Sequence, residues 1–402
     1  MARKASKKTE KKTSKRSAPK KAAQKNAVAA GIKKASRQKV AEKAMDLPAV
    51  QRELKKRWDV LNMQRLAAET QLSKVHDEIM RTPNVTGVHV GLWKRRLSKN
   101  DATETWVSPL QFCIRVHVKE KFDDQNDPRI YAMLPSAYGD IAVDVCERSY
   151  TNQASDGTPI RGQTAASAAA GAPTDNFTKP IEGGVPIAIE SLKSNHWGTL
   201  GGIVFSGANI RYLTNRHVVG KAAADGVDKL KVLQPPSGVV PTGQSAVIGT
   251  VTAAAPIDII DAALIKATGK RPRSRSIVGV HSQLFVNGVL TSGDEHHTVA
   301  FKVGAKSGFT QGIVTNTSAT VIVDDKEMSN QIIVDPMNET DDLCDSGDSG
   351  SLLVVEIVQN GITINQVVGL VHAEGSTGNK TQNRSIIACH FKDVQDYFGI
   401  MI

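Results

Sequence analysis

Three short stretches of this chain carry residues that could perform nucleophilic catalysis. In residues 345–351, Ser349 stands in the sequence Gly-Asp-Ser-Gly. Glycines allow a sharp turn and let a carbonyl group approach convergent backbone N–H groups. Because a serine alone is a weak nucleophile near neutral pH, it needs a base. His217 lies upstream as a candidate base, and Asp261 precedes an apolar run that predicts a buried strand.

The three stretches together resemble the trypsin/chymotrypsin-like serine proteases. Thr214–Val219 reads T-x-x-H-V-V, residues 261–266 read D-A-A-L-I-K, and the serine lies in G-D-S-G-S. The order His, Asp, Ser and the intervals of 44 and 88 residues are similar to those of the family. The resemblance covers about residues 179–402 and implies a mostly β, chymotrypsin-like double β-barrel.

The resemblance also implies a role for each residue. Ser349 would attack the scissile carbonyl, His217 would accept its proton, and Asp261 would orient and stabilise the histidine. The backbone N–H groups of Gly347 and Ser349 would form the oxyanion hole. Asp258 is a rival for the acid role, but Asp261 directly precedes the strand, as in the family.

The resemblance places a substrate pocket between Leu343 and the strand at 368–376. Its expected lining residues, besides Leu343, are Val371, His372, Ala373 and Glu374. Leu343 favours an aliphatic or small substrate side chain. Glu374, Asp342 and Asp345 favour a cation, whereas His372 would suit an acidic side chain, so the preference stays open.

Activation is a second open point. Secreted relatives are activated when a freed N-terminal isoleucine pairs with the aspartate beside the nucleophile, here Asp348. Ile181 begins a similar Ile-x-Gly-Gly sequence, but it follows Lys179 and Pro180. We expect a protease that folds without such cleavage.

Composition indicates the compartment and excludes some classes of protein. Aromatic residues make up 4% of the chain, so aliphatic cores are expected. No apolar run is long enough to span a bilayer, and the N-terminus lacks the apolar core of a signal peptide. The four cysteines are scattered (Cys113, Cys146, Cys344 and Cys389). These features favour a reduced, intracellular protein that is not secreted, in the cytoplasm or alternatively the nucleus or nucleoid.

The basic residues are concentrated at the N-terminus. The first 43 residues hold 16 Lys or Arg and two acids, which more than accounts for the net charge of +11. Residues 1–45 contain almost no large apolar side chain, so they predict a disordered tail. The tail could bind nucleic acid or another polyanion, bind an acidic partner or a membrane surface, or act as a solubilising or targeting segment.

The remaining chain divides by composition. Residues 46–83 carry apolar side chains at helical spacing, interrupted by Arg65, and predict an amphipathic helix that packs on the following domain or forms a dimer. Residues 84–150 predict a small α/β domain, 151–180 a flexible linker, and 181–402 the protease domain. His89 and His117 lack a third ligand, so we expect them to face solvent rather than bind a metal.

Three classes of function follow. The first is a serine endopeptidase acting on protein or peptide substrates with no cofactor and no metal. The second is a catalytically weak pseudoprotease that serves as a scaffold. The third is a nucleic-acid-associated protein acting through its basic tail.

Overall fold

The computed structural model describes residues 44–95, 105–120, 134–152, 177–191, 196–220, 230–257, 260–268, 271–280, 285–337, 341–376 and 384–402. Residues 44–402 form one compact unit. Nearly all of the expected tail over 1–45 and most of the expected linker over 151–180 lie outside the described residues, as does Asp258.

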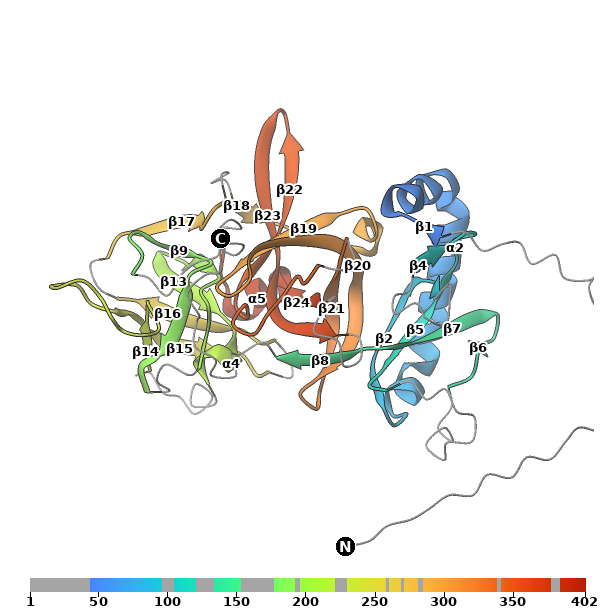
Figure 1. The fold of residues 1–402 in the computed structure, drawn as a ribbon, viewed down its shortest axis with the longest axis horizontal. Coiled ribbons are helices and arrows are strands. Elements are labelled where there is room, and N and C mark those ends of the chain that lie inside the picture. The colour runs from blue at the N-terminus through green and yellow to red at the C-terminus, as the bar shows by residue number, and fades with distance from the viewer. Residues whose placement is uncertain are drawn as a thin grey trace, which may run out of the picture. The chain divides into compact units, whose positions relative to one another are not determined.

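The first barrel is an antiparallel sheet of short strands (Figure 1). Its strands are β10 (Pro186–Ile189), β11 (Trp197–Thr199), β12 (Gly202–Ser206), β13 (Asn209–Thr214), β14 (Lys231–Leu233), β15 (Val247–Ala254) and β16 (Ala263–Ala267). They are ordered β11-β10-β14-β15-β16-β13-β12. Because only Leu200 and Gly201 separate β11 from β12, the two ends of the sheet meet. Aliphatic side chains such as Ile187, Val232 and Ile265 fill the interior.

The second barrel has the same strand order when β11 and β12, which only two residues separate, are taken as one strand. Its strands are β19 (Val299–Gly304), β20 (Gly308–Val323), β21 (Lys326–Pro336), β22 (Leu352–Gln359), β23 (Ile362–Ser376) and β24 (Ser385–His390). They pair as β19-β22-β23-β24-β21-β20, and β19 also pairs with β20, which closes the barrel. The closing helix α5 (Phe391–Phe398) follows β24. The shared strand order confirms the expected chymotrypsin-like double β-barrel.

Smaller elements connect the barrels. β9 (Ile181–Gly183) pairs in parallel with β17 (Arg273–Ile277), and β18 (Phe285–Asn287) pairs in parallel with β23. The short 3-10 helix η4 (Ser292–Asp294) precedes β19, and α4 (Arg216–Val219) follows β13. None of the helices in the described ranges combines the length and apolar character that crossing a bilayer requires.

The N-terminal layer consists of a long helix on a small sheet. The helix α2 (Leu47–Met80) begins at Asp46, whose side chain accepts from the backbone N–H of Ala49 at 2.8 Å. It packs on the central strands through Val50, Leu54 and Leu61. Those strands are β2 (Val85–Leu92), β5 (Phe112–Val118) and β7 (Ile141–Glu147). At the margins lie β1 (Ala44–Met45), β3 (Lys94–Arg95), β4 (Thr105–Val107) and β6 (Ala137–Tyr138).

This layer is joined to the second barrel by backbone pairing. β2 pairs with β20 through Gly87 and Val88, so the sheet runs without interruption from barrel to N-terminal layer. The segment expected as a small domain over 84–150 therefore extends the second barrel. β8 (Ser149–Asn152) leaves this layer and pairs with β20 and β23, so the expected linker begins after Asn152 rather than at Thr151.

The apolar stripe of α2 packs on its own sheet, which is the first of the two alternatives for residues 46–83. The expectation that His89 and His117 face solvent was wrong. His89 and His117 are buried, with ring centroids 4.8 Å apart, because both faces of β2 are covered. The described residues contain no cluster of His, Cys, Asp and Glu able to hold a metal ion.

Candidate active site

Strand pairing brings His217 and Asp261 together. Thr214, the last residue of β13, pairs with Ala263, the first residue of β16, so the residues after β13 and before β16 meet at one end of the barrel. His217 Nδ1 is hydrogen-bonded to Asp261 Oδ2, and the backbone N–H of His217 donates to Asp261 Oδ1 at 3.1 Å. The Asn215 amide donates to the Asp261 carbonyl oxygen at 2.5 Å. These bonds fix both the ring and the carboxylate.

The environment keeps Asp261 ionised. Burial alone would raise the pKa of Asp261, but the hydrogen-bonded His217 ring outweighs burial and holds the pKa below its ordinary value. His372 also lies near this carboxylate, and its own burial lowers its pKa to about 4, so its ring is neutral at pH 7. His372 Nε2 lies 2.8 Å from the Gln331 side-chain oxygen. The ring of His372 is therefore packed in the interior behind the pair.

Ser349 lies in a tight loop before β22. Its hydroxyl donates to the carbonyl oxygen of His372 at 3.2 Å, and it has 0% of its surface exposed. His217 Nε2 has no hydrogen-bond partner among the described residues. The structure thus brings His217, Asp261 and Ser349 to one region, with the serine hydroxyl turned toward β23.

The loop also presents backbone donors. Gly347 has φ +111, and a Cβ there would lie 2.3 Å from the Trp197 ring, so only glycine fits. The Gly347 carbonyl accepts from Thr199 Oγ1 at 2.8 Å, which fixes the loop on the first barrel. Within the described part of the chain, no backbone or side-chain acceptor takes the N–H of Gly347 or Ser349. These two N–H groups are the ones predicted to form an oxyanion hole.

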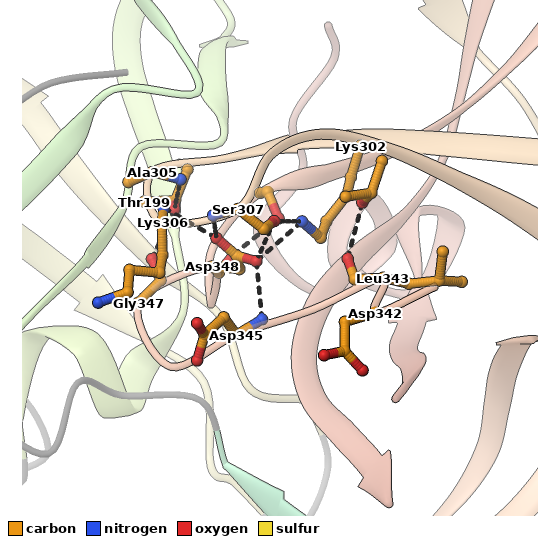
Figure 2. Close-up of polar contacts among 12 residues, drawn as sticks. Thr199, Lys302, Ala305, Lys306, Ser307, Asp342, Leu343, Asp345, Gly347 and Asp348 are labelled. Carbon is orange, nitrogen blue, oxygen red and sulfur yellow. Dashed lines mark hydrogen bonds and ion pairs between the residues drawn. The ribbon is translucent and has the colours of Figure 1, made fainter. Parts of the chain in front are cut away.

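Asp348 anchors the loop from inside (Figure 2). Its carboxylate pairs with Lys302 Nζ at 2.9 Å, and both side chains are 0% exposed. It also accepts from the backbone N–H groups of Lys306, Ser307 and Asp345. Burial would raise the pKa of Asp348, but Lys302 and these donors lower it below its ordinary value. The loop is thus built around a fully paired, buried anion.

The partner of Asp348 bears on activation. Ile181 is buried inside the chain, and its N–H donates to the Pro272 carbonyl oxygen at 2.8 Å. It is therefore an internal residue of β9. The buried cation beside Asp348 is Lys302, a side chain of β19, so the ion pair needs no freed N-terminus.

The expected pocket residues differ in what they present. Leu343, Val371 and Ala373 contribute side chains to the second-barrel core, and His372 faces Asp261 and Gln331. Glu374 alone of the five keeps its side chain partly exposed, at 16%. The side chains of the other four are buried.

Arg384 is a site residue that sequence reasoning missed. It lies 3.1 Å from Asp345, 3.2 Å from Glu374 and 3.3 Å from Asp342. One guanidinium thus gathers the three carboxylates expected near the cleft, and the cluster keeps an excess of negative charge. No motif marks Arg384, and its partners lie 10 to 42 residues away in the sequence.

Comparisons with known proteins agree with this architecture. No protein-family model and no curated protein matches the chain. Solved structures do, over 55% of this chain. The matched structures are those of trypsin/chymotrypsin-like serine proteases. One match is a glutamic acid specific serine protease that uses a histidine triad in substrate binding (16% identity, 100% of that chain, TM-score 0.39). Another is Thermobifida fusca protease A (16% identity, 97% of that chain, TM-score 0.38). A third is Cellulomonas bogoriensis chymotrypsin (15% identity, 97% of that chain, TM-score 0.37). At these identities and TM-scores the likeness carries no argument about this chain, so its fold and chemistry must follow from its own strands and residues.

Proposed function

We propose that this protein is a serine endopeptidase that uses Ser349, His217 and Asp261. The observation that carries the proposal is the His217–Asp261 hydrogen bond beside a His217 Nε2 that has no partner among the described residues. Such a ring is held in one orientation and one tautomer, with its second nitrogen available as a base. The Ser349 loop supplies the nucleophile next to two backbone donors.

The reaction would proceed by acyl transfer. The Ser349 hydroxyl leaves the His372 carbonyl, turns toward His217 Nε2 and attacks the scissile carbonyl, while its proton passes to His217. Asp261 stabilises the resulting imidazolium, and the N–H groups of Gly347 and Ser349 stabilise the oxyanion. His217 then donates the proton to the leaving amine. In the second half of the reaction, water attacks the acyl-enzyme carbonyl while His217 accepts a proton from it. His217 then returns the proton to the Ser349 oxygen as the acyl group leaves.

Substitution of the three residues tests the proposal. Ser349→Ala or His217→Ala should reduce kcat for a peptide substrate about 10⁴-fold, because the members of a triad act as one unit. Asp261→Asn should also cause a large loss. Circular dichroism should show an intact fold in each variant. Peptide hydrolysis at the wild-type rate by Ser349→Ala would rule the mechanism out.

The carboxylates around Arg384 bear on substrate preference. A substrate side chain that entered near Asp342, Asp345 and Glu374 would meet three carboxylates against one guanidinium. This excess of negative charge favours Lys or Arg over Glu before the scissile bond. The ratio of kcat/KM for two peptides that differ only in Lys or Glu at this position tests the preference, and a higher value for Glu would contradict it.

A catalytically weak scaffold is the second candidate function. It is favoured by one observation, the bond from Ser349 Oγ to the His372 carbonyl in place of His217 Nε2. Under this alternative the fold would bind peptides without turning them over, so peptide binding would survive in Ser349→Ala while the wild type showed no hydrolysis.

A further inference from the structure

The face of α2 that points away from its sheet carries an apolar patch. The buried residues Leu61 and Ala68 mark the face that packs on the sheet. On the opposite face, Val60, Met63 and Leu66 expose 52%, 71% and 49% of their surface. Helical residues three or four positions apart are neighbours, so these three side chains form one continuous outer patch. Single exposed apolar side chains are common, but a contiguous group on one element is typical of an interaction surface.

Two opposite charges flank the outer patch at equal distances from its centre. Asp59 lies seven residues before Leu66, and Lys74 lies seven residues after Ala67. At about 1.5 Å per residue, the two charged residues are about 22 Å apart along the helix axis. Both are exposed, and neither has an ion-pair partner in the part of the chain that the structure describes. Their charges are therefore available to a partner molecule.

This pattern of charges is complementary to its own reverse. A two-fold axis that passes between Leu66 and Ala67 would bring two α2 helices together in antiparallel orientation. Asp59 of each copy would then lie opposite Lys74 of the other copy, so the ion pair would form twice. A parallel pair would instead place like charges side by side. The charges therefore favour an antiparallel pair of two copies.

The next exposed charges outward follow the same symmetry. Lys56 lies ten residues before Leu66, and Asp77 lies ten residues after Ala67. The same two-fold axis would therefore place Lys56 of each copy opposite Asp77 of the other. Asp77 already has Arg81 at 3.9 Å in its own helix, so this outer pair should be the weaker of the two.

We propose that the outer patch of α2 is the docking surface for a second copy of this chain, in an antiparallel two-fold dimer centred between Leu66 and Ala67. The apolar side chains supply the affinity, because ion pairs at an exposed rim contribute little. The ion pairs set the orientation and the register of the two helices. A membrane surface fits this face less well, since it would attract a run of cations rather than alternating signs. The dimer is independent of the proposed peptidase activity.

An exchange of charges tests the register. The dissociation constant of the full-length dimer is measured by sedimentation equilibrium for the wild type, Asp59→Lys, Lys74→Asp and the double variant. Each single substitution places like charges opposite each other at two positions, so it should raise the dissociation constant about tenfold. The double variant restores opposite charges and should return to within about twofold of the wild type. A double variant that dimerises no more tightly than the single variants would overturn the proposal.

A charge placed in the outer patch tests the surface itself. Met63→Glu should raise the dissociation constant at least about tenfold, because a carboxylate would be buried against the second copy. Val239→Glu is the matched control, since Val239 is 75% exposed but belongs to the first barrel, and it should leave dimerisation unchanged. Both residues are exposed in the single chain, and circular dichroism should show an intact fold. A dimer that survives Met63→Glu, or a wild type that stays monomeric at about 100 μM, would overturn the proposal.

Discussion

Lys302 is the side chain on which the conformation of the nucleophile loop most depends. Its ammonium group is fully buried, 2.9 Å from Asp348 and 2.6 Å from Ser307 Oγ. A buried lysine is unfavourable unless it is paired, and a buried carboxylate is equally unfavourable alone. Each group therefore requires the other. Since Asp348 directly precedes Ser349, loss of the pair should reach the site.

Lys302→Met should destabilise the protein and disable the site. The substitution leaves the Asp348 carboxylate buried without its cation, which should lower the free energy of unfolding by about 3–5 kcal/mol. Lys302→Arg keeps the charge and is the matched control, expected to lose less. Urea unfolding and peptide hydrolysis are measured for both. A Met variant as stable and as active as the Arg variant would show that the pair has no such role.

At the scale of elements, the turn at Gly347 joins the nucleophile loop to the first barrel. Its backbone has φ +111, and its Cα faces the Trp197 ring of β11. A side chain would move either the loop or the indole ring. In both cases the N–H of Gly347 would be displaced from the position expected of an oxyanion donor.

Gly347→Ala should therefore reduce turnover strongly, and Gly207→Ala supplies the control. Gly207 also has positive φ, at +57, but a Cβ there meets nothing within 4 Å. Gly207→Ala should cost about 1 kcal/mol of stability from backbone strain alone and leave kcat unchanged. Gly347→Ala should lower kcat at least about 100-fold, the loss expected for one oxyanion donor. Similar kcat values in the two variants would contradict the assigned role of Gly347.

The contact between the N-terminal layer and the second barrel should be sensitive to acid. Burial lowers the pKa of His89, His117 and His296, with His296 at about 3, and nearby cations such as Arg115 and Lys94 add to the effect. In the unfolded chain these rings titrate near 6.5. The unfolded state therefore binds more protons below that pH, so stability is highest above 6.5 and falls as the pH drops toward 3.

Removing one ring should flatten this dependence. His296→Phe should reduce the slope of unfolding free energy between pH 5 and pH 6.5 by up to about 1.4 kcal/mol per pH unit. The neighbouring Glu295, whose pKa is raised to about 8 by burial, acts in the opposite direction in both proteins. Trp106→Phe, whose ring lies 6.5 Å from His296, controls for packing and should keep the wild-type slope. Equal slopes in wild type and His296→Phe would refute the prediction.

Across the whole molecule, residues that lie in recognisable sequence motifs could be predicted as site candidates. Residues that only tertiary contacts bring to the site could not. The turn-separated apolar strands predicted the barrels, and the T-x-x-H and Asp-Ala-Ala-Leu stretches led to His217 and Asp261. Lys302 could not be found this way, because a lysine in an alternating strand is normally exposed and its partner is 46 residues away. The sequence predicts a surface position for His89, because it does not show that one face of β2 is covered by a barrel that lies far away in the chain.

Residues 1–45, the basic tail, are expected to bind polyanions without contributing to the proposed peptidase activity. Residues 1–43 hold 16 cations and no aromatic residue, so contacts to phosphates without sequence preference are predicted. Full-length protein should bind DNA and RNA, with affinity falling at least about tenfold between about 50 and about 200 mM salt. A version that starts at Asp46 should lose this binding and hydrolyse a short peptide at the same rate. Equal nucleic-acid affinity in both versions would exclude the tail as the binding segment.

Ser349 is the nucleophile of the proposed mechanism, and a fluorophosphonate probe can detect its reactivity without a peptide substrate. The probe is small and reacts only where nucleophile, base and oxyanion donors act together. The wild type should gain one adduct by intact mass, mapped to Ser349 after digestion, and His217→Ala should react at least about 100-fold more slowly. No adduct on the folded wild type, or an adduct on another residue that persists in Ser349→Ala, would contradict the account.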